Sequence, residues 1–350
     1  MMKRTSASFF VVAFLTAALS ASCQEAISGS GAGGQQAKPA QATTPPGSRP
    51  LPAARIRSAA ITILSSNVVN GGIGEWGFAA LVEADGRRIL FDTGAQADTV
   101  LRNVRSARID LSEVTDLVFS HGHGDHTGGL MALRSELGKA NRQALSRAHL
   151  APGFFNPRIV QGREVNWNGE LKAEYEAGGG TFIEHAKAEQ IAPGVWLTGP
   201  IARVHPEENW WSGGGGRVKR PDSTLAENNM PEDQALVLDT ERGLVVLSGC
   251  GHAGIINTLE YARQQVRQAP LHAVIGGFHL IGTEDARIDW TARKLKELGV
   301  ENFFGAHCTG IEAVYRIRQI TGLDRKACAV AAVGGVFRLD KGIDPGPIAR

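Results

Sequence analysis

The sequence has few cysteines and almost no net charge. Its 350 residues include four Cys, at positions 23, 250, 308 and 328, and no two of them are closely spaced. This spacing excludes a scaffold held together by disulfide bonds and a zinc site made of cysteine alone. Lys and Arg number 37 against 35 Asp and Glu, and no long basic run occurs, so we expect no nucleic-acid partner.

The sequence also lacks an apolar run long enough to cross a membrane. Lys3 and Arg4 precede an uncharged, largely apolar stretch from Thr5 through Leu19, which is shorter than the roughly 20 residues of a membrane-spanning helix. Small residues follow this stretch. A basic start, a short apolar segment and small residues are typical of a signal peptide, so we expect residues 1–22 to be removed and the protein to be exported.

Cys23 follows three small residues, as the acylated cysteine of a bacterial lipobox does, although Ser20 stands where that signal prefers Leu. We therefore expect a periplasmic or extracytoplasmic lipoprotein that touches the membrane only through a lipid on Cys23; a soluble periplasmic or secreted protein is the alternative. Residues 23–57 hold Gly, Ser, Gln, Ala and five Pro, with scarcely any large apolar side chain. Such a segment buries too little surface to offset its ordering entropy, so we predict a flexible tether.

From residue 58 to 340, short apolar runs alternate with turn signals and helical stretches, which predicts an α/β domain followed by a tail at 341–350. Asp85 and Gly86 are typical of a hairpin turn between two strands. Residues 140–235 show no clear pattern and are predicted to be an irregular insertion whose loops cover a site. We expect strands at 60–64, 77–83, 88–91, 116–119, 236–238, 244–247, 273–275, 302–304 and 329–333, and helices at 98–104, 130–137, 255–267, 288–298 and 311–321.

Several predicted strands end in clusters of polar residues and glycines. Because strand ends gather at one edge of a sheet, we expect these clusters to form a site there. Six of the ten His fall within them, which indicates that the site binds a metal ion. The clusters are Asp92–Gly94, Ser120–His126, Ser248–His252, Gly276–His279 and Gly305–Gly310.

Four metal-binding side chains occur within six residues, in the sequence Ser-His-Gly-His-Gly-Asp-His that runs from Ser120 to His126. Residues two apart in extended backbone project to the same side, so His121 and His123 can bind one ion. Asp125 and the last His lie at the entry to the following helix and face a second position. The glycine spacers allow the chain to turn tightly around a metal, so this segment predicts a metal site.

This motif and the preceding Leu-Phe-Asp-Thr-Gly at 90–94 resemble the metallo-β-lactamase superfamily. Three further segments are similar to its branch of dihydropterin-6-methyl-ribofuranosylaminobenzene 5'-phosphate synthase-like proteins and metal-dependent hydrolases. The resemblance extends over residues 60–335 and implies an αββα sandwich with the metal site at one edge. The three segments are Ser-Gly-Cys-Gly-His-Ala-Gly-Ile-Ile-Asn-Thr at 248–258, Ile-Gly-Gly-Phe-His-Leu at 275–280 and His-Cys-Thr-Gly at 307–310.

The resemblance also implies a set of metal ligands. Asp92 would support the set from beneath, and His279 would be a ligand or a substrate contact. The implied ligands are His121 and His123 at a first position, Asp125 and His126 at a second, and His252 and His307, which complete the coordination.

The sequence departs from the family pattern at two places. Most two-metal hydrolases of the superfamily place an Asp at the end of a later strand to bridge the ions, but here that strand runs into Ser248, Gly249 and Cys250. One ion therefore stays an alternative to two. Cys250 is either a soft zinc ligand or a small buried side chain, and an oxidised pair with Cys308 is a further alternative. The second departure is Gly124, where the branch often has Tyr.

The default chemistry of such a site is hydrolysis of a small ester, phosphoester, lactone or related substrate by metal-activated water. Asp125 would be the catalytic residue, orienting that water or accepting its proton, and Zn2+ is the expected ion, with Mn2+, Fe2+ or Mg2+ as alternatives. Two other functions stay open: a transferase like the synthase branch, and a tethered metal- or ligand-binding protein without turnover. The presence of Asp125 favours catalysis, and an export signal argues against a cytoplasmic pterin pathway.

The expected partner is a small-molecule substrate, which should be contacted from the insertion and the neighbouring strand ends. Taken one by one, each of these contact residues is better explained as a solvated loop position. Arg203 would pair with a phosphate or a carboxylate. The candidate substrate contacts are His149, Arg203, Glu208, Trp210, Trp211, Asp233 and Thr309.

Overall fold

A computed structural model describes residues 54–207 and 216–349. The expected signal peptide, Cys23 and most of the expected tether lie outside the described residues, as do Glu208, Trp210 and Trp211. Within the described ranges, no helix combines the length and the apolar character that a bilayer span needs. The folded domain begins before the predicted residue 58, because Ile56 is buried and pairs with Thr240.

The larger of the two main sheets has eight strands. In order across the sheet they are β19 (Gly342–Asp344), β18 (Val336–Arg338), β1 (Ala59–Ser65), β2 (Ala79–Ala84), β3 (Arg87–Phe91), β4 (Asp116–Val118), β5 (Arg147–Leu150) and β8 (Thr181–Glu184). Asp85 and Gly86 join β2 to β3 with φ of 45° and 80°, as a two-residue hairpin turn requires, so that prediction is confirmed. β3, β4, β5 and β8 run parallel, which places their carboxyl ends at one edge.

The other main sheet has seven strands. In order they are β17 (Cys328–Val330), β16 (Phe303–Gly305), β15 (Leu271–Gly276), β14 (Gly243–Ser248), β13 (Ala235–Thr240), β10 (Val195–Leu197) and β9 (Glu189–Ala192). β14, β15, β16 and β17 are parallel, so their carboxyl ends also share an edge. A small third sheet contains β12 (Leu225–Glu227), β11 (Arg217–Lys219), β6 (Arg158–Val160) and β7 (Arg163–Val165).

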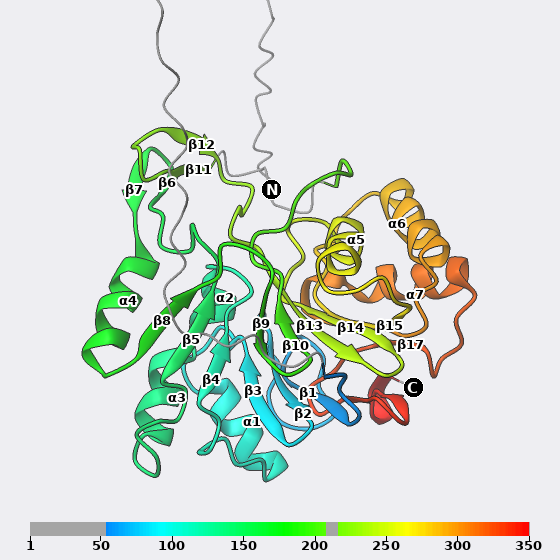
Figure 1. The fold of residues 1–350 in the computed structure, drawn as a ribbon, viewed down its shortest axis with the longest axis horizontal. Coiled ribbons are helices and arrows are strands. Elements are labelled where there is room, and N and C mark those ends of the chain that lie inside the picture. The colour runs from blue at the N-terminus through cyan, green and yellow to red at the C-terminus, as the bar shows by residue number, and fades with distance from the viewer. Residues whose placement is uncertain (1–53, 208–215, 350) are drawn as a thin grey trace, which may run out of the picture. The chain divides into compact units, whose positions relative to one another are not determined.

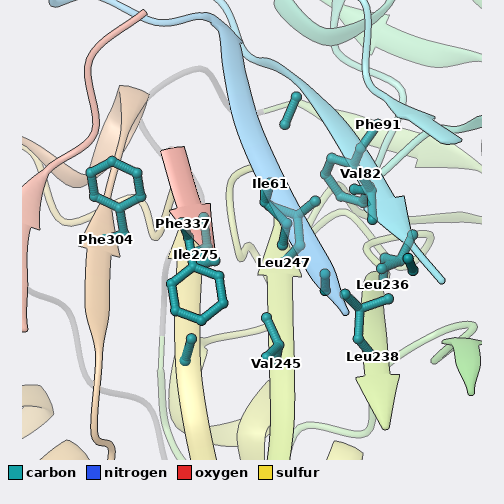
Figure 2. Packing of buried hydrophobic residues seen from close by; sticks show 14 of the residues in the cluster. Ile61, Val82, Phe91, Leu236, Leu238, Val245, Leu247, Ile275, Phe304 and Phe337 are labelled. Atoms are coloured by element: carbon teal, nitrogen blue, oxygen red, sulfur yellow. The ribbon is translucent and has the colours of Figure 1, made fainter. Parts of the chain in front are cut away.

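The two main sheets pack face to face through buried apolar side chains. Ile61 and Phe91 of the first sheet lie against Leu236 and Leu247 of the second (Figure 2). Neighbouring residues of a strand face opposite sides, so Leu247 lies between the sheets while Val246 belongs to the cluster on the helical side. Strands buried on both faces therefore account for the long apolar runs in the sequence.

Helices cover the outer faces of both sheets, as Figure 1 shows for α1 and α3 on one side and for α5, α6 and α7 on the other. The resulting αββα sandwich confirms the expected fold class. The helices are α1 (Thr99–Ala107), α2 (Gly124–Thr127), α3 (Leu130–Leu137), α4 (Trp167–Ala177), α5 (Ile255–Gln265), α6 (Asp285–Glu297) and α7 (Ile311–Thr321), with short 3-10 helices at His307–Thr309 and Pro347–Ala349.

The expectation of an irregular insertion over residues 140–235 is wrong for most of that range. β5 and β8 extend the first sheet, β9 and β10 extend the second, and α4 packs beside β8. Each of these strands has three or four residues, too few for a two-residue period to appear in the sequence. The predicted tail also takes part in the fold, because β19 pairs with β18.

Candidate metal centre

The polar clusters predicted at the strand ends meet at one edge of the sandwich. Asp92 follows β3, and the segment 120–126 follows β4, its parallel neighbour. His252 follows β14 of the second sheet, with the loops after β15 and β16 beside it. Nε2 of His252 lies 3.2 Å from Nε2 of His121, so loops of the two sheets are in direct contact.

Asp92 holds the metal-binding segment in place. Its carboxylate accepts hydrogen bonds from the backbone N–H and the hydroxyl of Ser120, at 2.8 and 2.7 Å, and from Nδ1 of His126 at 2.7 Å. Burial alone would lower the pKa of His126, but the charge and hydrogen bond of Asp92 raise it to about 9. Asp92 therefore turns Nε2 of His126 toward the centre and makes that nitrogen a strong base for a cation.

Three imidazoles converge in one half of the centre. Nε2 of His121 lies 3.0 Å from Nδ1 of His123 and 3.2 Å from Nε2 of His252. The hydroxyl of Ser120 donates to Asp92 and accepts from Nδ1 of His121 at 2.9 Å, which leaves a lone pair on Nε2 of that ring. Burial lowers the pKa of His123 to about 3, so this ring is a neutral imidazole, the form that binds metal ions.

The other half of the centre contains His126, Asp125 and His307. Oδ2 of Asp125 lies 3.2 Å from Nε2 of His307 and 3.8 Å from Nε2 of His126, and Nε2 of His307 makes no aligned hydrogen bond within the described part of the chain. Burial opposes ionisation of Asp125, but the two neighbouring imidazoles hold the pKa of its carboxyl well below the usual range. A carboxylate and imidazole nitrogens at these distances are suited to share a cation.

The sulfur of Cys250 lies close to ligand atoms of both halves. It lies 3.1 Å from Nε2 of His126 and is almost completely buried. Within the described ranges, three groups of side chains have ligand atoms that all lie within 4.8 Å of one another, and these are His121, Cys250 and His252; His126, Cys250 and His307; and Cys250, His279 and Cys308. Imidazole nitrogen and thiolate sulfur are the ligands that zinc and related ions prefer, so these residues fit a metal ion.

Cys250 and Cys308 are in contact as free thiols. Their sulfurs lie 3.3 Å apart without a disulfide bond, and the sulfur of Cys308 accepts the backbone N–H of His279 at 3.2 Å. The alternative of an oxidised pair is therefore not what the structure contains. The sulfur of Cys250 is available as a metal ligand instead.

At this edge of the sandwich, loops approach each other closely and several residues have strained backbone conformations. A Cβ atom on Gly249 would lie 2.0 Å from Oγ of Ser120 and 2.7 Å from Oδ2 of Asp92, so any other residue would push the two loops apart. Asp92, His279 and His307 have φ of 55°, 45° and 46°. Left-handed backbone is uncommon in residues other than Gly, and strained residues of this kind are typical of functional sites.

The structure brings the predicted metal ligands together and places three of the predicted substrate contacts behind them. Arg203 donates hydrogen bonds to backbone carbonyls, including that of His252 at 3.3 Å. Asp233 accepts the N–H of Ala253 at 2.8 Å, and its burial raises its pKa to about 7. Thr309 is buried and donates to the backbone carbonyl of Gly276, the last residue of β15, at 3.0 Å. These contacts hold the loops that carry the ligands.

His149, another predicted substrate contact, lies elsewhere. Its Nε2 is 3.1 Å from Oδ1 of Asp116, and its Nδ1 is 2.9 Å from Nε2 of His185. Asp116 begins β4, whereas the metal-binding segment follows the end of that strand. Nδ1 of His185 in turn lies 2.8 Å from Glu189. His149 therefore belongs to a second buried polar cluster, in which both of its ring nitrogens already have partners.

Several residues that surround the ligands were not predicted from the sequence. Oδ1 of Asn67, in the loop after β1, lies 3.3 Å from Nδ1 of His307. The half-exposed ring of Trp76 is 4.9 Å from the same imidazole. Arg158 and Glu232 form a buried ion pair at 2.5 Å. None of the four stands in a recognisable motif, because each acts through its position in the fold.

Comparisons with known proteins agree with this geometry. The sequence pattern of the metallo-beta-lactamase superfamily matches residues 77–266. The chain is 31% identical over 245 residues to the 7,8-dihydropterin-6-methyl-4-(beta-D-ribofuranosyl)-aminobenzene-5'-phosphate synthase of Methanocaldococcus jannaschii, covering 67% of this chain and 81% of the relative. An uncharacterised protein of the same organism is 30% identical over 251 residues, covering 70% and 88%.

A solved structure is similar over nearly its whole length. It is Tm1679, a metal-dependent hydrolase of the beta-lactamase superfamily, with a TM-score of 0.63, 28% sequence identity and coverage of 80% of this chain and 98% of that one. Members of the superfamily typically bind divalent metals and are generally enzymes. The matched residues 77–266 include His121, His126 and His252, which come from loops of both sheets, and the chain therefore belongs to the metallo-β-lactamase superfamily.

Proposed function

We propose that this protein is an exported metal-dependent hydrolase that acts on a small ester, phosphoester, lactone or related substrate. The observation that carries the proposal is the position of Asp125, whose Oδ2 lies 3.2 Å from Nε2 of His307. The Asp125 side chain is 21% exposed, whereas the His307 and His126 side chains are fully buried. Water and substrate can therefore reach the carboxylate while the imidazoles behind it stay in place.

The protein side of the chemistry follows from these contacts. A bound metal would supply activated water and polarise the carbonyl or phosphoryl oxygen of the substrate. Asp125 stays ionised despite its burial, because neighbouring imidazoles stabilise its charge, so it can accept a hydrogen bond from a water molecule and orient it. Asp92 keeps its neighbouring ligand in one orientation. The residues that would hold metal are His121, His123, His126, His252, His307, Cys250 and Asp125.

Zinc is the ion we infer for this centre, as one or two ions. Its ligand atoms are mainly imidazole nitrogens with one shared sulfur, and Asp125 is the carboxylate beside them. Nitrogen and sulfur ligands suit Zn2+ and, less well, Fe2+, whereas Mg2+ and Mn2+ prefer sites made of oxygen. Mn2+ and Mg2+ are therefore the weaker candidates.

A transferase is the second candidate, and one observation favours it. The similarity to the synthase of Methanocaldococcus jannaschii covers 81% of that relative at 31% identity. A transferase of that kind would join two substrates instead of adding water to one. An exported location, which we propose from residues 1–23, would separate this protein from a cytoplasmic pathway, so we rank hydrolysis first.

Metal analysis combined with a substrate panel tests the proposal. Wild type should hydrolyse at least one class among phosphoesters, lactones and carboxylic esters, and Asp125→Asn should lose about 100- to 10,000-fold in rate while keeping its fold. Asp116→Asn is the matched control, because it removes a partly buried carboxylate that contacts a different histidine. It should keep the wild-type rate.

The other outcomes separate the alternatives. Full metal content without hydrolysis of any substrate class would exclude the hydrolase. Product that forms only when a second, acceptor substrate is present would then indicate a transferase. Full metal content with neither reaction would indicate a tethered binding protein.

We also propose that the exported protein is anchored through a lipid on Cys23. The basic start, the short apolar stretch and the small residues before Cys23 support the anchor. Wild type should fractionate with membranes, and Cys23→Ser should move to the soluble fraction. If Cys23→Ser protein still fractionates with membranes, the lipid anchor is excluded. Wild type found in the soluble fraction would instead indicate a soluble periplasmic or secreted protein.

A further inference from the structure

We propose that the sulfur of Cys250 bridges two metal ions. The inference rests on the metal binding that the proposed function requires, and it is independent of which reaction the centre performs. Within the described chain, Cys250 is common to all three groups of converging ligand atoms. One of these groups pairs its sulfur with two imidazoles from one half of the centre, and another pairs it with two from the other half.

Each half of the centre offers three ligand atoms besides the sulfur of Cys250. A four-coordinate ion in each half would therefore need this one sulfur as a ligand of both ions. His121, His123 and His252 offer three imidazole nitrogens in one half, with neighbouring nitrogens 3.0 and 3.2 Å apart. The other half offers two imidazole nitrogens and one carboxylate oxygen. Zinc in proteins is most often four-coordinate and can expand to five ligands at a catalytic site, so a fourth protein ligand in each half still leaves a position for the activated water. The sulfur of Cys250 is within reach of both.

The sulfur also has the chemistry that a bridge needs. A thiolate carries several lone pairs on one large atom, so two ions can bind it at once. Cys250 is 2% exposed, which keeps water from competing for the sulfur. The sulfur lies 3.1 Å from Nε2 of His126 and 3.3 Å from the thiol of Cys308. The thiol can donate a hydrogen bond to the bridge without replacing it.

Glycines bring the backbone of Cys250 to this point. A Cβ on Gly249 would lie 2.0 Å from Oγ of Ser120, and one on Gly277 would lie 2.1 Å from the carbonyl oxygen of Gly249. The loop after β14 is therefore pressed against loops of both sheets, with Cys250 between the two sets of histidines. Substitution of either glycine would move the sulfur away from one of them.

A bridging thiolate predicts a spectroscopic signature that does not depend on turnover. The full chain is stripped of metal and titrated with Co2+, with metal content and absorption followed together. Wild type should bind two ions per chain, and the thiolate-to-cobalt charge-transfer band should grow with both equivalents, because the same sulfur binds both ions. Growth with only one of the two equivalents, or binding of a single ion, would overturn the proposal.

Two substitutions locate the sulfur. Cys250→Asp keeps a bridging anion but removes the sulfur, so it should retain two ions, lose the charge-transfer band and favour Mn2+ over Cd2+ compared with wild type. Cys308→Ser is the matched control, because Cys308 is the neighbouring buried thiol and belongs only to the third group. It should keep both ions and the band. Loss of the band in Cys308→Ser with its retention in Cys250→Asp would assign the signal to the third group and overturn the proposal.

Cadmium NMR of the wild-type protein keeps the test independent of whether a variant folds. With Cd2+ in both positions, two resonances are expected, and both should be shifted in the direction that sulfur ligation produces. A single sulfur-shifted resonance beside one typical of nitrogen and oxygen ligands would overturn the bridge. A preparation that shows both shifts but hydrolyses nothing would contradict the proposed reaction and leave the bridge standing.

Discussion

The metal centre and the second cluster are both buried groups of histidines and carboxylates. In each, a carboxylate contacts one ring nitrogen of a histidine, and the two groups differ in what the other ring nitrogen contacts. In the metal centre, Asp92 binds Nδ1 of His126 at 2.7 Å, and Nε2 points toward the other ligand atoms. In the second cluster, Asp116 lies 3.1 Å from Nε2 of His149, and Nδ1 meets the ring of His185 at 2.9 Å. Both groups begin with a carboxylate behind an imidazole, so this contact does not by itself indicate a metal site.

The two groups differ in whether their nitrogen, oxygen and sulfur atoms converge on one space. The rings of His149 and His185 have centroids 5.2 Å apart, and the chain of contacts continues to Glu189 at 2.8 Å. Every ring nitrogen in this line has one partner, so the second cluster is a hydrogen-bonded chain that links neighbouring strands. In the metal centre, nitrogens from both sheets and one sulfur approach the same space. Composition is similar in the two groups, and geometry decides which of them can hold an ion.

The largest difference between the two groups should appear in metal content when one imidazole is removed from each. His126→Ala removes a ligand from the second half of the metal centre and should lose at least one bound ion per chain. His149→Ala removes an imidazole that is also buried, from the second cluster, and should keep the full metal content. Elemental analysis after gel filtration measures both. Equal loss of metal from the two variants would erase the distinction between the groups.

A smaller effect is expected from the carboxylate behind each imidazole. Asp92→Asn weakens the support of His126 and should lower metal affinity by about 10- to 100-fold, because partners of this kind orient the ligand and raise its basicity. Asp116→Asn makes the same change behind His149 and should leave metal affinity unchanged. Competition with a chromophoric chelator gives the two affinities. An equal loss in both variants would point to a general destabilisation of the fold.

The smallest effect concerns acid stability of the second cluster. Burial opposes ionisation of Asp116, but hydrogen bonds from His149 and Arg147 hold its pKa well below the usual range. A folded pKa below the unfolded value of about 4 means that the ionised group stabilises the protein at neutral pH, and this contribution is lost as the pH falls through the folded value. Metal-free Asp116→Asn should therefore lose less of its free energy of unfolding than wild type as the pH falls from about 5 toward 2.

Denaturant titrations at a series of pH values measure this difference. Asp340→Asn, at an exposed carboxyl, is the control and should follow wild type. Parallel loss of stability in wild type and Asp116→Asn would mean that the ionised carboxylate does not hold the second cluster together.

Most of the regular structure could be predicted from the sequence. The strands β1 to β3 and β13 to β15 have five to seven residues and are largely buried, so their apolar runs are long enough to be recognised. The pair Asp85 and Gly86 specifies its turn locally, through residues that tolerate positive φ. The strands of the range 140–235 escaped prediction because they are short and are placed by their neighbours in the sheets.

The site could be predicted in part. His121, His123, Asp125 and His126 stand close together in the sequence, and their spacing alone indicates a metal site. The supporting residues carry no such signal. Asn67 reaches His307 across a separation of 240 residues, so only the folded chain shows that the two belong together.

The sequence by itself determined the α/β character, the order of most strands and helices, and the close spacing of His and Asp side chains at 121–126, because these depend on periodicity and on the chemistry of near neighbours. Tertiary structure alone decided that Cys250 lies 3.1 Å from His126, which is 124 residues away, and that His149 joins a different cluster. The physical reason is that ligand geometry is set where two sheets pack face to face. No local pattern in the chain records which loops that packing will bring together.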